Sequence, residues 1–151
     1  MKIRLITVGK IKEPYLRKGI AFYEKELKKK ISFEMIEVED EKTPDRASEK
    51  VENKIKEVEG DRILRYIPED AHVVALAIDG KALSTEQFAK KVKQIEQAGC
   101  PAMVFVIGGS LGLANEVLRR AQTKISFSAM TFPHQMMKMI LLEQLNRVLE
   151  Y

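Results

Sequence analysis

The stretch "FVIGGSLGL", Phe105 to Leu113, passes from branched and aromatic apolar residues into three glycines spaced G-G-x-x-G. The apolar half has the composition of a buried strand, and the glycine half is typical of a loop in which a small ligand approaches bare backbone. A tight turn into a following helix explains the same glycines equally well. The stretch therefore predicts a buried strand that ends in either a turn or a ligand loop.

Segments on both sides of this stretch alternate between strand and helix patterns. Strands are predicted at 2–9, 31–40, 72–80, 101–109 and near 124–127. Helices are predicted at 13–30, 51–64, 84–98, about 114–121 and 133–150, with a break or kink in the second of them at Gly60 and Asp61. The segment 72–80 is almost entirely apolar, as in a strand covered on both faces. This order predicts an α/β fold with a mainly parallel sheet and helices on both faces, in one domain spanning 1–151.

Composition narrows the class of protein only moderately. Lysine and arginine number 26 against 22 acidic residues, a net charge of +4 that suits an anionic partner such as RNA but equally describes a solvated surface. No apolar run approaches the roughly 20 residues that span a bilayer, and we expect a cytoplasmic protein without a metal site. The single Cys100 cannot form an internal disulfide, and we expect it to pack inertly rather than to act as a nucleophile.

The glycine loop lacks the features of the common phosphate-binding loops. A triphosphate loop needs Lys and then Ser or Thr after its last glycine, where this chain has Leu113 and Ala114. A dinucleotide loop needs G-x-G-x-x-G and an acidic residue about 20 positions later, where Thr131 and Phe132 stand. A ligand without phosphates remains, its adenine and ribose held by backbone groups and apolar walls, and S-adenosylmethionine fits that description.

The segment "FSAMTFPHQMMKMILLEQL", Phe127 to Leu145, places a loop of small residues before Pro133, which is well suited to begin a helix. The helix is apolar on more than one face. We therefore expect part of it to contact another subunit or a wrapped segment of the chain, with Leu141 and Leu142 as candidates for contact with another subunit.

The motifs "VGK", "IEVEDEKTP", "FVIGGSLGL" and "SFSAMTFPHQMMKMILLEQL" together resemble the RlmH family, small SPOUT-class methyltransferases that modify N3 of a pseudouridine in large-subunit (23S) ribosomal RNA. The resemblance spans nearly the whole chain. It implies a C-terminal trefoil knot, a homodimer built through the knotted region, S-adenosyl-L-methionine as cofactor, and ribosomal RNA or the assembled ribosome as partner. The cofactor contacts that it implies are Leu76, Gly108, Phe127, Ser128, Ala129, Met130, Thr131 and Phe132.

The resemblance assigns no catalytic base. N3 of pseudouridine must lose a proton as it gains a methyl group, so a positioned base or water is expected to assist. His134 is the histidine near the cofactor segment, although it equally suits a local hydrogen bond at a helix start, and His72 is expected to be structural. Cationic candidates for RNA contact are Lys10, Lys12, Arg17, Lys18, Lys138 and Arg147, each of which is also explained as a solvated charge.

Two alternatives remain open at the level of sequence. Family members usually continue past the last helix into a tail that ends in a Tyr-His pair, whereas this chain ends at Tyr151 and has Asn146 where tyrosine is typical. One alternative is therefore a protein of the same fold that binds the cofactor or RNA with impaired catalysis. The other is a flavodoxin-like nucleotide or flavin module, which the same order of elements permits.

Overall fold

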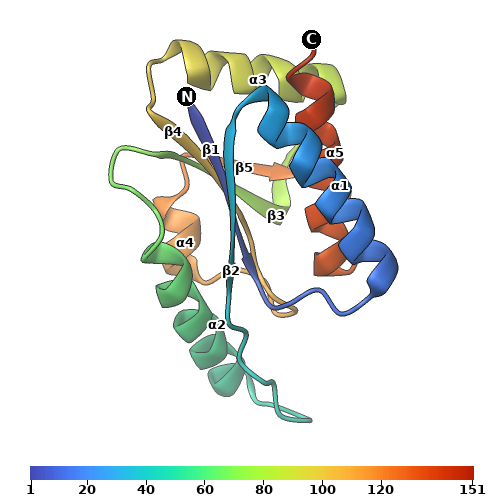
Figure 1. Cartoon of the computed structure of the whole chain (residues 1–151). Helices are drawn as coiled ribbons and strands as arrows, with labels where there is room; N and C mark the ends of the chain where they lie inside the picture. The colour runs from blue at the N-terminus through green and yellow to red at the C-terminus, as the bar shows by residue number, and fades with distance from the viewer.

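The computed structural model describes residues 1–151, which form a sheet between two helical layers (Figure 1). The strands are β1 (Lys2–Val8), β2 (Ser32–Val38), β3 (His72–Ala82), β4 (Ala102–Ile107) and β5 (Thr123–Ser126). The helices are α1 (Pro14–Lys30), α2 (Glu49–Leu64), α3 (Thr85–Gln97), α4 (Asn115–Arg120) and α5 (His134–Val148).

All the strands run parallel, in the order β2-β1-β4-β3-β5. The central strands β1 and β4 are apolar along most of their length because helices cover both of their faces. Leu5 lies beside Phe105 in the register, and both are fully buried. The predicted parallel sheet with helices on both faces is confirmed, and it brings the carboxyl ends of all the strands to one edge.

The helices divide into two layers, each with its own apolar core (Figure 1). Helices α1, α3 and α5 cover one face, where Leu16, Phe88 and Leu141 belong to the larger cluster of buried residues. Helices α2 and α4 cover the other face through residues such as Ile63 and Val117. Cys100 is partly buried against the larger cluster, as expected of a packing residue. No helix is both long enough and apolar enough to cross a membrane.

Local sequence explains the start of α3 and corrects the expected kink in α2. Ser84 and Gln87 form a reciprocal capping box at the start of α3. Helix α2 is continuous through Gly60, so the predicted break is wrong. A Cβ atom at Gly60 would lie 3.1 Å from Cβ of Ala114 and 3.2 Å from Cγ2 of Val117, so this glycine permits close packing of α2 on α4.

The last helix is covered mainly by its own chain. Leu141, Leu142 and Leu145 of α5 have 0% exposure within this single chain, so they cannot be the residues that contact another subunit. A Cβ atom at Gly19 of α1 would lie 2.4 Å from Sδ of Met139, which shows how closely α1 packs on α5. The broad apolar surface of α5 is therefore shared between the sheet and α1, so a segment of the same chain covers part of the helix, and Leu141 and Leu142 are excluded as contacts to another subunit.

Strand β3 has an irregular second half that shapes the edge of the sheet. Leu76 and Lys81 both align with Ile125 of β5, so residues 77–80 leave the regular ladder. Gly80 passes so close to β5 that a Cβ atom there would lie 2.7 Å from the carbonyl carbon of Ile125. The sheet is covered on both faces, as predicted, only at Val73, Val74 and Ala75, which are buried. The residues that follow are partly or fully exposed and can line a cavity.

Candidate functional site

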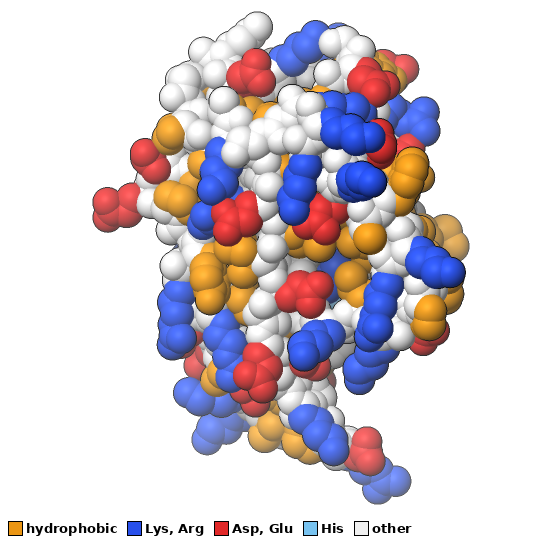
Figure 2. Space-filling model, in the orientation of Figure 1, with side chains coloured by type: hydrophobic (Ala, Val, Ile, Leu, Met, Phe, Trp, Pro, Cys, Tyr) orange, Lys and Arg blue, Asp and Glu red, His pale blue; other side chains and the backbone are white.

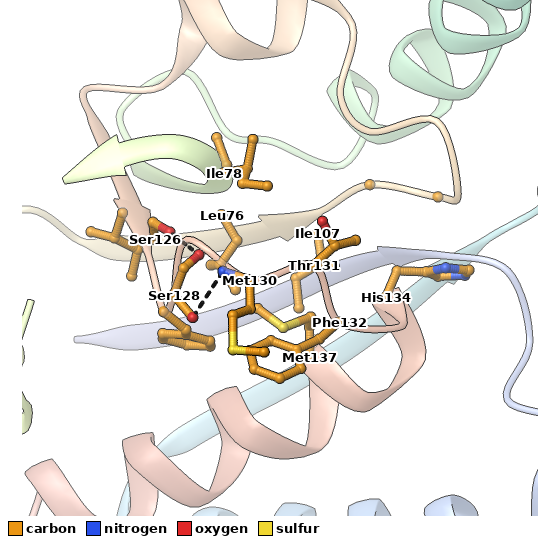
Figure 3. Close-up of a pocket in the computed structure, with 15 residues that line it drawn as sticks. Leu76, Ile78, Ile107, Ser126, Ser128, Met130, Thr131, Phe132, His134 and Met137 are labelled. Atoms are coloured by element: carbon orange, nitrogen blue, oxygen red, sulfur yellow. Dashed lines mark hydrogen bonds between the residues drawn. The ribbon is translucent and has the colours of Figure 1, made fainter. Parts of the chain in front are cut away.

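A cavity of about 150 Å³ lies at the carboxyl ends of β3, β4 and β5, the edge at which open parallel sheets usually bind ligands (Figure 3). Leu76 enters it from β3, Ile107 from β4 and Met137 from α5. The remaining lining residues are Ala77, Ile78, Gly108, Gly109, Ile125, Ser126, Phe127, Ser128, Met130, Thr131, Phe132 and His134. Segments far apart in the chain thus share one largely apolar cavity.

The residues singled out from the sequence gather around this cavity with one exception. Leu76, Gly108, Phe127, Ser128, Met130, Thr131 and Phe132 all line it. Ala129 is exposed and does not line it. Sequence reasoning missed Ile78, Ile107 and Met137, since their patterns are those of ordinary strand and helix residues.

The glycine loop is closed by its own backbone. Gly112 has a φ of +88°, which favours glycine, and Gly109 pairs with Gly112. A Cβ atom at Gly108 would lie 2.7 Å from the carbonyl carbon of Gly112, so any side chain there forces the loop apart. The glycines therefore make a tight turn, and Gly108 and Gly109 also present bare backbone to the cavity. The two explanations offered by the sequence are compatible.

The loop between β5 and α5 is folded by hydrogen bonds of its own serines. The Ser126 hydroxyl donates to the Ser128 carbonyl at 2.9 Å, and the Met130 backbone N–H donates to Ser128 Oγ at 3.0 Å (Figure 3). The Ser126 proton is used within the loop, whereas the Ser128 hydroxyl, which accepts here, keeps its own proton to donate. The other side chains that the loop offers the cavity are mainly apolar. Met130 is 71% exposed and Ile78 is 64% exposed, so apolar side chains reach solvent at the cavity mouth.

A second, wider cavity of about 710 Å³ adjoins the first and shares Leu76, Ile78, Gly109 and His134 with it. It adds Asp79 and the rest of the glycine loop, Ser110 to Leu113. No lysine or arginine lines either cavity, so nothing there matches a phosphate. The mainly apolar lining of the combined site suits a flat, weakly polar ring. Asp79, the acidic residue in the lining, suits a positive charge on the same ligand.

His134 separates these cavities from a third cavity of about 680 Å³ and different character. The third cavity, here called the polar cavity, is lined by Gly9, Lys10, Lys12, Glu37, Val38, Glu39, Asp40, His134 and Gln135. The His134 ring points away from Met130 and Met137 in Figure 3. Burial and then the charge of Lys138 lower the pKa of His134, while Asp40 opposes them. The start of α5 has no side-chain cap hydrogen bond, so His134 does not serve as a helix cap.

One of the six cationic candidates for RNA contact, Lys138, is unsuited to it. Lys138 is fully buried, its ammonium donates to the Gly9 carbonyl at 2.9 Å, and burial lowers its pKa. Arg147 forms an ion pair with Glu143. Lys10, Lys12 and Lys18 are exposed. Figure 2 shows basic side chains interspersed with acidic ones on one face, so charge alone marks no RNA surface there.

Glu59, a buried acidic residue that the sequence did not single out, lies beneath the glycine loop. Glu59 of α2 is 5% exposed, and its carboxylate accepts the Glu41 backbone N–H at 2.9 Å. A Cβ atom at Gly109 would lie 3.2 Å from Glu59 Oε1, so the same side chain underlies the glycine loop. Burial raises the pKa of Glu59. No group of three or more His, Cys, Asp or Glu side chains is arranged to hold a metal ion.

The chain belongs to the SPOUT methyltransferase family: the family model described as "Predicted SPOUT methyltransferase" matches residues 1–150. Among curated relatives, the ribosomal RNA large subunit methyltransferase H of Bifidobacterium adolescentis is 52% identical over 147 residues, covering 97% of this chain and 92% of the relative. Proteins of the same name from Streptococcus pneumoniae are 48% identical over the same share.

A solved structure supports the fold alone. The chain is similar to a probable methylase family protein from Haemophilus influenzae Rd KW20, with a TM-score of 0.53 and 14% sequence identity. The match covers 98% of this chain and 66% of that chain.

Proposed function

We propose that this protein transfers a methyl group from S-adenosylmethionine to N3 of a pseudouridine in large-subunit (23S) ribosomal RNA. The observation that carries the proposal is the apolar, backbone-rich cavity at the carboxyl ends of β3 to β5, which lacks any phosphate-matching cation in a chain of the SPOUT methyltransferase family. Relatives named ribosomal RNA large subunit methyltransferase H support the choice of RNA. Ribosomes are cytoplasmic, and we place the protein there.

The residues around the cavity fit the proposed cofactor. Leu76, Phe127, Met130 and Phe132 offer apolar walls for adenine, and Gly108 offers backbone groups. Ser128 and Thr131 complete the same wall, and Ala129 is assigned a backbone role because its side chain lies outside. Asp79 in the adjoining cavity suits a positively charged group. When bound, S-adenosylmethionine supplies an electrophilic methyl group.

His134 is the residue best placed to accept the N3 proton. It lines both the cofactor cavity and the polar cavity, so a base between them lies within its reach. Its lowered pKa keeps the imidazole neutral at neutral pH, and a neutral imidazole can accept a proton. We therefore assign it the role of general base.

We also propose that residues 1–151 form one domain with a C-terminal trefoil knot. Residues 77–80 leave the regular ladder, and the residues on either side of them, Leu76 and Lys81, both align with Ile125. This irregular path supports the proposal that the chain passes through its own loop. The backbone contact at Gly80 supports the same crossing. Such threading is rare among proteins, and the family resemblance is the reason to propose it.

A homodimer completes the proposal. Exposed aromatic side chains on α1 support it, because Tyr15 is 62% exposed and Phe22 is 59% exposed, one heptad apart on the same helix. The exposed apolar rim of the cofactor cavity, at Ile78 and Met130, supports a second copy close to the site.

Methyl transfer to ribosomes tests the proposed function. Ribosomes that lack the modification are incubated with the protein and S-adenosylmethionine carrying a tritiated methyl group. We expect incorporation into large-subunit RNA, together with cofactor binding by calorimetry. Binding without incorporation would instead support a cofactor-binding protein of the same fold. Neither binding nor incorporation at saturating cofactor would contradict the proposal.

A further inference from the structure

The polar cavity lies beside the cofactor cavity and is built from different elements. Its walls come from the end of β1, the end of β2 with the connector that follows, and the first turn of α5. His134 is the residue that lines all three cavities around it. A group bound in the polar cavity would therefore face the cofactor cavity across His134.

The first turns of α5 hold one wall of the polar cavity in place. Gln135 Nε2 donates to the Lys10 carbonyl at 2.8 Å, and Gln135 Oε1 accepts the Lys12 backbone N–H at 3.4 Å. The buried Lys138 ammonium donates to the Gly9 carbonyl. Gly9 has a φ of +87°, so this turn requires glycine. The lysines of the wall are thus presented by a fixed backbone.

The opposite wall is anchored to α2. The Arg62 guanidinium donates to the Glu39 carbonyl at 2.8 Å and forms an ion pair with Glu41. Glu59 accepts the Glu41 backbone N–H. Asp40, which lies between these anchored residues, packs beside Gly9, since its Cβ would be 3.7 Å from a Cβ there. Both walls of the polar cavity are therefore held in place by hydrogen bonds, one to α5 and the other to α2.

The charged groups of the polar cavity are unpaired. Glu37, Glu39 and Asp40 form no salt bridge, and neither do Lys10 and Lys12; the ion pairs of the chain use other residues. Carboxylates accept N–H donors, and exposed lysines bind phosphates. A ligand that offers ring N–H groups on one side and phosphates on the other matches this arrangement.

Asp40 is the acid of this cavity that acts most directly on His134. Its charge raises the pKa of His134, against the effects of burial and Lys138. Pseudouridine has two ring N–H groups, N1–H and N3–H, on either side of one carbonyl, whereas the N1 of uridine is bonded to ribose. A base whose N3–H faces His134 can donate its N1–H to a neighbouring carboxylate.

We propose that the polar cavity receives the target nucleotide and that Asp40 accepts the N1–H of pseudouridine, which distinguishes pseudouridine from uridine. Lys10 and Lys12 contact the phosphates flanking that nucleotide. The inference rests on the proposed function, because it assigns the substrate side of the same site.

The test compares two preparations of ribosomes, with pseudouridine or with uridine at the target position, for the wild type and Asp40 variants. For Asp40→Ala we expect kcat/KM on pseudouridine to fall about tenfold or more, the size of a lost hydrogen bond to a charged group, with little change on uridine. Asp40→Asn should retain part of the preference, since its carbonyl oxygen still accepts. Asp45→Ala, an exposed acid of the same connector outside the cavity, is the control.

If Asp40→Ala lowered kcat/KM equally on both ribosomes, or on neither, the preference for pseudouridine would be unchanged and the inference would be overturned. If the wild type methylates neither ribosome, the proposed function fails, and the cavity is tested by binding alone. Pseudouridine and uridine 5′-monophosphates at millimolar concentration are titrated while backbone amide NMR signals of residues 9–12 and Gln135 are followed. Stronger binding of pseudouridine that Asp40→Ala abolishes would support the inference, and unperturbed signals would refute it.

Discussion

His134 shows how the surroundings of a single residue decide what it can do. A helix-start histidine is usually a local hydrogen-bonding group, but this ring has no capping role and stands between two cavities of opposite character. Burial and Lys138 favour its neutral form, and Asp40 favours its charged form. The net effect lowers its pKa, so the imidazole remains a proton acceptor at pH values where an ordinary histidine begins to be protonated.

A pH profile tests this role. The acid limb of single-turnover methyl transfer should fall below pH about 6.5, the ordinary histidine value, because the pKa of His134 is lowered and only its neutral form accepts a proton. His134→Gln should reduce the rate by about 10²–10⁴-fold, as for loss of a general base, with unchanged cofactor affinity. If His134→Gln retained the wild-type rate and the same acid limb, His134 would not be the general base.

Gly108 tests the glycine loop at the same scale. In Gly108→Ala the new Cβ meets the backbone of Gly112, so the loop must open. We expect cofactor affinity, measured by calorimetry, to fall about tenfold or more, equivalent to at least about 1.4 kcal/mol. Gly99→Ala is the control, because Gly99 precedes β4, at the end of that strand opposite the cavity, and a Cβ atom there would meet no atom within 4 Å. Equal cofactor affinity in the two variants would show that the loop does not hold the ligand.

At the scale of elements, periodicity predicted most of the fold. Alternation and capping signals located every strand and helix, since each depends on neighbours within a few residues, as at Ser84 and Gln87. Where long-range contacts decide, the sequence was insufficient. Gly60 was predicted to break or kink α2, but the helix is continuous there, and the glycine permits close contact with α4. The bulge at residues 77–80 depends on the path of β5, which no local pattern encodes.

The sequence indicated the residues of the largely apolar cavity better than those of the polar cavity. Gly108 and the run Phe127 to Phe132 follow recognisable motifs, and all of them except Ala129 line the apolar cavity, whereas Asp40, Gln135 and Lys138 resemble ordinary surface residues in sequence. Their juxtaposition arises from the contact of α5 with the end of β1. Lys138 is the clearest example, since a lysine of that kind is normally solvated but this one is fully buried.

Helix α5 gives a stability prediction at this scale. Leu142 has 0% exposure within the chain, so Leu142→Ala should lower the free energy of unfolding by about 2–5 kcal/mol through a cavity that cannot fully collapse. Met136→Ala, on the same helix but only partly buried, should cost less. Denaturant unfolding monitored by circular dichroism measures both. Equal and small losses would place Leu142 outside the core.

At the scale of the whole molecule, the exposed aromatics of α1 predict the dimer interface. Phe22→Lys and Tyr15→Lys place charges on an apolar surface that a partner would cover, and we expect either to shift sedimentation from dimer to monomer at micromolar concentration while the fold is retained. Lys28→Ala, which removes an exposed charge about 120° around α1 from Phe22, should leave the dimer intact. A monomeric wild type would contradict the dimer, and dimeric variants would move the interface elsewhere.

The most direct test of the proposed function is the chemical identity of the product. Ribosomes lacking the modification are incubated with the protein and S-adenosylmethionine, and the nucleosides of large-subunit RNA are separated and identified by mass spectrometry. We predict 3-methylpseudouridine with the wild type and strongly reduced amounts with Gly108→Ala and His134→Gln. A methyl group on any other nucleoside, or no methylated product despite cofactor binding, would contradict the proposal.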